Sequence, residues 1–160
     1  MENLNSLSNS NLTNNALVGV LINGTVVYNI LLEEPEFSIS GLSIIHQMRT
    51  DLNSFVGKIF ESQSYDGIDF ISNQNVKFSS YLSESNQNIE TFSNISNFIQ
   101  KQQNKYFFNY FYIIDYANKL LIVKIPDTDL VALDYTNKED VSKFKNSINE
   151  IIKPIPERDF

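Results

Sequence analysis

The chain contains no cysteine among its 160 residues. This absence excludes disulfides, thiolate catalysis and metal sites built on cysteine. Histidine is nearly absent too, so a catalytic triad or a zinc site that needs histidine would have to use His46. No Asp or Ser partner lies near His46 in a recognisable pattern, and no Gly-x-Ser-x-Gly turn is present. We therefore interpret His46 as a residue on the shoulder of the first predicted helix, at the margin of its buried face.

Glycine is scarce as well, and its five residues are scattered along the chain at Gly19, Gly24, Gly41, Gly57 and Gly67. They form neither Gly-x-Gly-x-x-Gly nor a Walker loop, so we predict no nucleotide and no other cofactor. The acidic pair in Asp127-Thr128-Asp129 supplies fewer oxygen ligands than a calcium or magnesium site needs. We interpret it as a turn, predict no metal site, and predict that the chain is not an enzyme.

Positive charge is in the minority, with 12 basic against 19 acidic residues and a net charge of −7. Such a field repels phosphate-rich partners and attracts basic ones, so we predict neither nucleic acid nor membrane as a partner. No apolar run reaches the roughly 18 residues that span a bilayer. Residues 1–15 lack both the basic start and the apolar run of a signal peptide. We expect a cytoplasmic protein with a disordered polar leader over residues 1–15.

The pattern after this leader indicates a hairpin. Ala16–Ile22 and Thr25–Leu32 are apolar and β-branched, and Asn23-Gly24 between them accepts the positive φ angles of a type I′ turn. A helix is predicted near residues 40–61 from apolar residues at spacings of three and four, and Gly57 within it would suit close packing on a sheet. The pattern between residues 68 and 102 predicts two short strands, at 68–71 and 76–82, and a helix over 86–102.

The segment from Tyr106 to Lys153 carries the strongest pattern. It predicts strands at 106–114, 120–125 and 130–133, joined by tight turns, followed by a helix near 138–153. Thr136 and Glu139 have the spacing of a capping box at the start of that helix. A short tail would occupy residues 155–160, so we predict a single domain over residues 16–154.

The resulting order is ββα-ββα-βββα, which predicts an α+β fold with a single antiparallel sheet and helices packed on it. This order of elements resembles that of the roadblock, longin and profilin group of small domains, over about Ala16 to Lys153. The resemblance implies a shape and transfers no functional residue, and the helical segment at 86–102 departs from the simplest members of the group.

Aromatic residues dominate the predicted strand at 106–114. Alternation places Tyr106, Phe108, Tyr110 and Tyr112 on one face. Both faces are largely apolar, so a central strand covered by helices is one interpretation. The alternative is that the tyrosine face is uncovered and binds a partner, because tyrosine is enriched at protein interfaces. We treat these four residues, together with the acidic patch Glu33, Glu34 and Glu36, as candidate partner-binding residues.

Three functions remain open from the sequence. The first is a non-catalytic protein–protein interaction module, an adaptor or complex-forming subunit that forms a homodimer or another homo-oligomer. The second is an immunity-type or inhibitor protein that neutralises a basic partner through charge complementarity. The third is an enzyme whose site is assembled from residues without local spacing.

Overall fold

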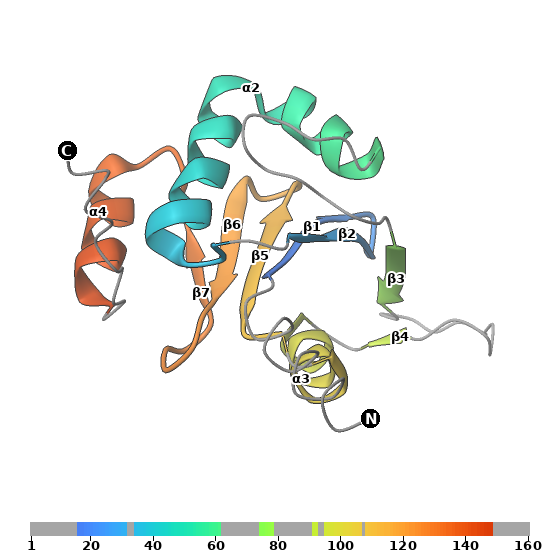
Figure 1. The fold of residues 1–160 in the computed structure, drawn as a ribbon. Helices are drawn as coiled ribbons and strands as arrows, with labels where there is room; N and C mark the ends of the chain where they lie inside the picture. The colour runs from blue at the N-terminus through green and yellow to red at the C-terminus, as the bar shows by residue number, and fades with distance from the viewer. Residues whose placement is uncertain are drawn as a thin grey trace.

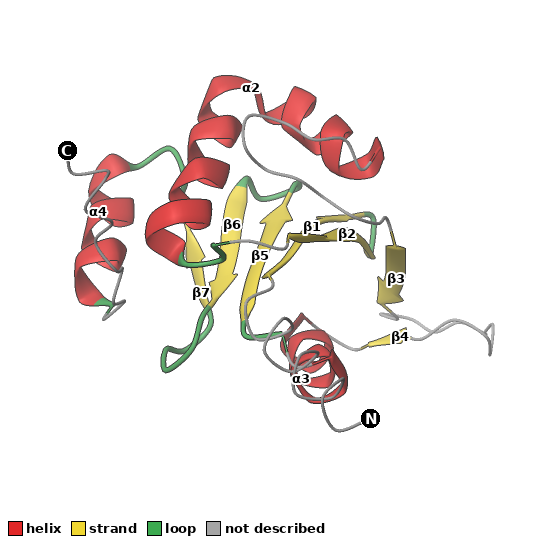
Figure 2. Cartoon of the chain, viewed as in Figure 1, coloured by secondary structure: helices red, strands yellow, loops and turns green. Residues whose placement is uncertain are grey.

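A computed structural model of the chain describes residues 16–31, 34–61, 74–78, 91–92, 95–106 and 108–148, with the main chain alone for 74–78, 91–92 and 105–106. The predicted leader at 1–15, the strand at 68–71 and the tail at 155–160 lie outside the described residues. Within them the fold is α+β, as predicted (Figures 1 and 2). The elements follow the order β1 (Ala16–Ile22), β2 (Thr25–Leu31), η1 (Phe37–Gly41), α2 (Leu42–Glu61), β3 (Gln74–Phe78), β4 (Thr91–Phe92), α3 (Ile95–Tyr106), β5 (Tyr110–Asp115), β6 (Leu120–Lys124), β7 (Val131–Leu133) and α4 (Lys138–Ser147).

The seven strands form a single sheet in the order β4-β3-β2-β1-β5-β6-β7. Strands joined by tight turns pair antiparallel, as expected for β1 with β2, β5 with β6 and β6 with β7. The sheet is nevertheless mixed, because β1 pairs with β5 and β3 with β4 in parallel. A chain that returns to the sheet through a long connection is free to enter parallel, and the prediction of a purely antiparallel sheet did not allow for this.

The β1–β2 hairpin forms as predicted. Asn23 and Gly24 both have positive φ angles, of 53° and 74°, and these angles give the turn the twist of the flanking strands. The register places Gly19 opposite Tyr28 and Ile22 opposite Thr25, with the turn between the last pair. Local turn chemistry therefore determines this part of the fold.

Helices cover both faces of the sheet, and each face has its own hydrophobic core. On one face α2 and α4 pack over alternate residues of the central strands, and α3 packs on the opposite face (Figure 1). The first core includes Val18, Tyr112 and Leu121, and the second includes Leu17, Phe111 and Phe98. This arrangement confirms that the aromatic strand β5 is central, with neighbours on both sides and both faces buried.

Several predicted boundaries are wrong. The helix expected over 86–102 begins at Ile95 and runs on to Tyr106, while residues 91–92 form β4. Consequently β5 begins at Tyr110, four residues later than predicted. In α3 the buried stripe is Phe98, Ile99 and Gln102, so a glutamine takes a core position that a search for apolar residues passes over. The strand predicted at 76–82 begins two residues earlier, because residues 74 and 75 already belong to β3. The expectation that Gly57 permits close packing on the sheet is also wrong, because an added Cβ atom there would meet nothing within 4 Å.

The capping box predicted at Thr136 does not form. The N-cap of α4 is Asn137, whose side-chain oxygen accepts hydrogen bonds from the amides of Glu139 at 3.0 Å and Asp140 at 3.1 Å. Thr136 instead donates its hydroxyl, at 2.6 Å, and its amide, at 3.0 Å, to the carboxylate of Asp134. Asparagine and threonine are both good caps, and here the asparagine takes the position.

We expect the Asp134–Thr136 turn to make stability depend on pH. The Thr136 hydroxyl and then its amide lower the pKa of Asp134 below its ordinary value of 3.8. A carboxyl whose pKa is lower in the folded state stabilises the fold above its ordinary pKa, and this contribution is lost as the pH falls through the lowered pKa. Asp134→Asn should therefore be less stable than the wild type at pH 6, and the difference should shrink as the pH falls below 3.8. Chemical denaturation of both proteins across this range measures the difference, and a gap that stays constant with pH would contradict the assignment.

Candidate protein-binding surface

The segment between β2 and η1 brings acidic residues onto the surface in a fixed conformation. Successive carbonyl groups of Glu34, Pro35 and Glu36 all accept hydrogen bonds from the fold. The Glu34 carbonyl accepts the Ser40 hydroxyl at 2.5 Å, and the Pro35 carbonyl accepts the Tyr112 hydroxyl at 2.6 Å. The Glu36 carbonyl accepts the amides of Ile39, Ser40 and Gly41 at 2.8–3.3 Å. The backbone of this acidic turn is thus held to both η1 and the central strand.

The π-helical turn η1 follows the Glu34–Glu36 segment directly and anchors it to the core. Its first residue, Phe37, is fully buried, and its ring lies 4.9 Å from that of Phe144 and 6.4 Å from that of Tyr112 between centroids. A Cβ atom at Gly41 would collide with the Phe37 ring, so glycine is required there for close packing. Single π-helical turns are rare in proteins, and those that do occur often lie near functional sites.

The Glu34 backbone is strained. Its φ angle of 52° lies in the left-handed region, which costs a residue other than glycine about 1–2 kcal/mol. The hydrogen bonds of the turn hold this conformation, which leaves the Glu34 side chain exposed and that of Glu36 partly buried. Glu33, the third member of the predicted acidic patch, lies outside the described residues.

The four aromatic candidates do not share one face. Tyr112 has no exposed surface, because α2 covers it and its hydroxyl is bonded to Pro35, so the expectation that it meets a partner is wrong. Phe108 precedes β5 and is buried in the opposite core, with its ring 6.2 Å from that of Phe111. Tyr106 is the last residue of α3, and its side chain lies outside the described residues. The alternation was counted through residues 106–109, which are not part of the strand.

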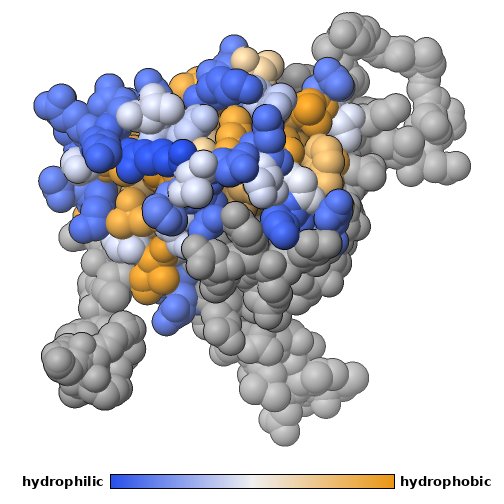
Figure 3. All heavy atoms as spheres, turned by 90° about the horizontal axis from the view of Figure 1, so that it is seen from above, coloured by the Kyte–Doolittle hydropathy of each residue, from blue (hydrophilic) through white to orange (hydrophobic). Residues whose placement is uncertain are grey.

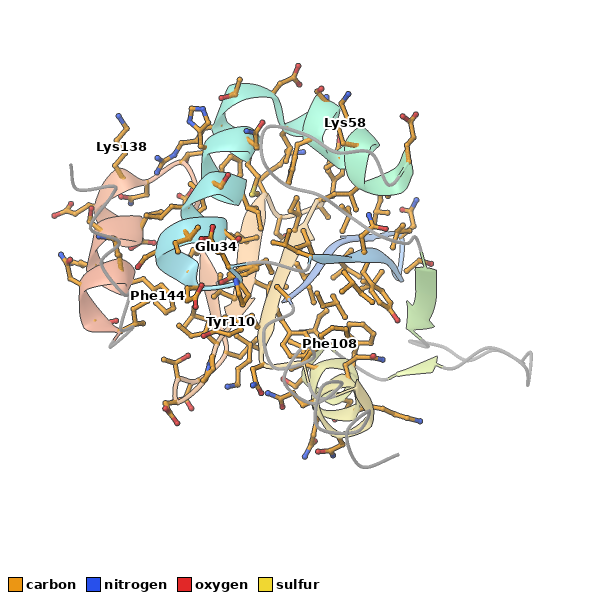
Figure 4. All side chains as sticks on the ribbon, in the orientation of Figure 1. Glu34, Lys58, Phe108, Tyr110, Lys138 and Phe144 are labelled. Carbon is orange, nitrogen blue, oxygen red and sulfur yellow. The ribbon has the colours of Figure 1, made fainter. Side chains whose placement is uncertain are left out.

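Tyr110 is the aromatic candidate that remains partly accessible. It is the first residue of β5, on the same face as Tyr112 and packed at the margin of the same core. Phe144 of α4 lies at this margin too, in edge-to-face contact with Phe37. In Figure 4 Glu34, Tyr110 and Phe144 are labelled in the part of the picture between α4 and β5, below the label of Lys138. We call Glu34, Glu36, Tyr110 and Phe144 the acidic–aromatic surface.

Sequence reasoning identified part of this surface and missed the rest. It predicted the helix near 138–153 but not that Phe144 and Ile148 are only partly buried, because α4 lies beside the edge strands and not over the middle of the sheet (Figure 1). Phe37 was not singled out, although its spacing of four residues from Gly41 could have indicated a ring packed against a glycine. The contacts that assemble the surface join residues far apart in the chain.

The other candidates lie in other elements of the fold. His46 is exposed on α2, and Asp127 lies in the β6–β7 turn with a φ angle of 66°. Thr128 closes that turn by donating its hydroxyl and its amide to the Ile125 carbonyl, which agrees with the interpretation of this acidic stretch as a turn. In the part of the chain that the structure describes, no three Asp, Glu or His side chains are grouped to hold a metal ion. None of the described helices combines the length and apolarity needed to cross a bilayer.

Comparisons with known proteins assign no family to this chain, so its function has to be inferred from its fold and surface. No family model, no curated protein and no solved structure matches the chain significantly.

Proposed function

We propose that this chain is a non-catalytic protein–protein interaction module, a complex-forming subunit that binds its partner through the acidic–aromatic surface. The observation that carries the proposal is the triple anchoring of the Glu34–Glu36 backbone to η1 and to Tyr112 of β5, which orders the segment that carries the two carboxylates before a partner binds. A surface that is ordered before binding avoids much of the entropy cost of association.

The chemistry of the surface suits a basic protein. Tyr110 offers apolar contact area with a polar tip, which is the kind of side chain that dominates interface energetics. Glu34 and Glu36 add negative charge at the rim, where charges accelerate encounter and select the partner. The net charge of −7 acts in the same direction over a longer range.

Crosslinking in the producing cells, followed by isolation of the crosslinked complex, would identify the partner. Calorimetry with the purified partner would then measure how variants of the acidic–aromatic surface bind it. We expect Tyr110→Ala to weaken binding at least tenfold. Glu34→Gln with Glu36→Gln should slow association and reduce its dependence on salt. Glu139→Gln with Asp140→Asn makes the same charge change at the other end of α4 and serves as the matched control. Equal losses in the two charge variants would mean that the partner binds elsewhere.

The excess of acidic residues favours a second candidate, an immunity-type inhibitor of a basic protein. Such a pair would bind one partner very tightly, and its affinity would fall steeply between low and physiological salt. An adaptor with several partners would show moderate affinities and a weaker salt dependence. Titrations of the isolated partner at several salt concentrations distinguish the two.

A further inference from the structure

The turn at the end of the β1–β2 hairpin contains the only asparagine of the chain that is followed by glycine. Asn23 and Gly24 are both exposed, and the pair that closes the hairpin, Ile22 with Thr25, is only partly buried. Within the described part of the chain, neither the Asn23 side chain nor the Gly24 amide has a hydrogen-bond partner. The carboxamide and the amide nitrogen that follows it are therefore both accessible and unengaged.

These two groups can react to form a cyclic imide. Asparagine is thermolabile, and the following glycine has no side chain to shield its nitrogen. The Gly24 nitrogen loses its proton to hydroxide and attacks Cγ of Asn23, and the bond from Cγ to the side-chain nitrogen breaks so that ammonia leaves. Water then adds to one of the two carbonyl carbons of the imide, and the ring reopens. Opening at Cγ gives aspartate, whereas opening at the main-chain carbonyl gives isoaspartate, and no group is oxidised or reduced.

The structure distinguishes Asn23 from Asn53, which also precedes a small residue. Asn53 belongs to α2, which lies at the top of Figure 1 and therefore on the side of the molecule that Figure 3 shows, where hydrophilic groups cover much of the surface. The Asn53 side-chain oxygen accepts the Tyr116 hydroxyl at 2.6 Å, and the Ser54 amide donates to the Asp51 carboxylate at 3.1 Å. Partners hold both reacting groups of this pair, so the helix must open before a ring can close.

We propose that Asn23 is a site of spontaneous deamidation in the folded protein, and that its conversion to isoaspartate breaks the β1–β2 turn. At Asn23 only the exposed end of a hairpin has to open for the attack, which is a local fluctuation. The site does not involve the acidic–aromatic surface, so the proposal is independent of the proposed function.

The two products should affect the hairpin differently. Isoaspartate routes the chain through the former side chain and so adds a methylene group to the main chain of a two-residue loop. The register on either side of that loop pairs Ile22 with Thr25 and Leu21 with Val26, and it leaves no slack for a longer connection. Aspartate keeps the chain length, and Asp-Gly suits a type I′ turn as Asn-Gly does. Isoaspartate should therefore destabilise the fold, and aspartate should not.

Incubation of the full chain under native conditions in mildly alkaline buffer, followed by peptide mapping with mass spectrometry, tests the site. Asn23 should be converted before Asn53, and both products should appear at position 23. An isoaspartyl methyltransferase, which methylates the isoaspartate and not the ordinary aspartate, distinguishes them. Conversion of Asn53 before Asn23 would overturn the proposal. So would an Asn23 that stays intact in the folded chain while the urea-unfolded chain is converted.

Asn23→Gly is the matched control for the structural consequence, because Gly-Gly also forms type I′ turns but has no carboxamide. As isoaspartate accumulates, the melting temperature of the wild type should fall by a few degrees, whereas that of Asn23→Gly should stay constant over the same incubation. Asn23→Asp reproduces the other product and should begin with a melting temperature close to that of the wild type. A wild type that accumulates isoaspartate without losing thermal stability would contradict the proposed break of the turn, as would an equal loss in Asn23→Gly.

Discussion

Alanine at Tyr112 is expected to lower the free energy of unfolding by about 3–5 kcal/mol, as for other large aromatic side chains removed from a core. The side chain is fully buried between the sheet and α2, and its hydroxyl ties the acidic turn to the central strand. Alanine at Tyr110 should cost clearly less, because that side chain is only partly buried. Urea denaturation of the two variants measures the contrast, and equal losses would contradict the assignment of Tyr112 to the core and Tyr110 to the surface.

Tyr112→Phe separates the hydroxyl from the ring. It keeps the packing and leaves the Pro35 carbonyl without its donor, which should cost about 1–3 kcal/mol for an unsatisfied buried group. Because that bond also holds the turn, this variant should weaken binding through the acidic–aromatic surface while it remains folded. A variant that loses stability but binds normally would show that the turn keeps its conformation without Tyr112.

Aspartate at Asn29 is expected to have the second large effect, about 3–5 kcal/mol at pH 7, because it places an uncompensated charge in the core. Asn29 has no exposed surface, and its side-chain amide donates to the Ile59 carbonyl at 2.7 Å. An ionised carboxylate cannot donate that bond. Burial should raise the pKa of the new carboxyl, so the loss should be small near pH 4 and grow as the pH rises towards 7.

Asn29→Leu is the control of similar size without a charge. It also removes the donor to Ile59, so it should cost about 1–3 kcal/mol, and this cost should not vary between pH 4 and pH 7. Thermal or chemical unfolding of both variants at the two pH values provides the comparison. A pH-independent loss in Asn29→Asp would mean that the aspartate side chain reaches solvent.

The sequence-based predictions were correct for elements whose structure is determined by residues close together in the chain. The Asn23-Gly24 turn and the alternation of the strands around it determine the β1–β2 hairpin within a short segment. The helix at α2 follows from apolar residues at its own spacing, five of which are buried as expected: Ile45, Met48, Phe55, Val56 and Ile59. Outside residues 62–94 the order of strands and helices along the chain was correct for the same reason, whereas β4 lies where a helix was predicted.

Prediction failed where competing local signals had nearly equal strength. Thr136 and Asn137 are both favourable N-caps, and the hydrogen bonds of Asp134 occupy Thr136 and leave the cap to Asn137. Tyr106 and Phe108 look like strand residues because they are aromatic, yet α3 extends through Tyr106. Only the packing of α3 on the sheet decides where the helix ends and β5 begins.

The sequence by itself determined the α+β class, the order of the elements outside residues 62–94, the first hairpin and the central place of the aromatic strand, because short-range periodicity and turn chemistry encode them. Tertiary structure alone decided the parallel pairing of β1 with β5, the burial of Tyr112 and the exposure of Phe60. The bond between Tyr112 and Pro35 joins positions 77 residues apart, and no local pattern records such a contact. The side chains that remain exposed to a partner depend on how the helices pack on the sheet.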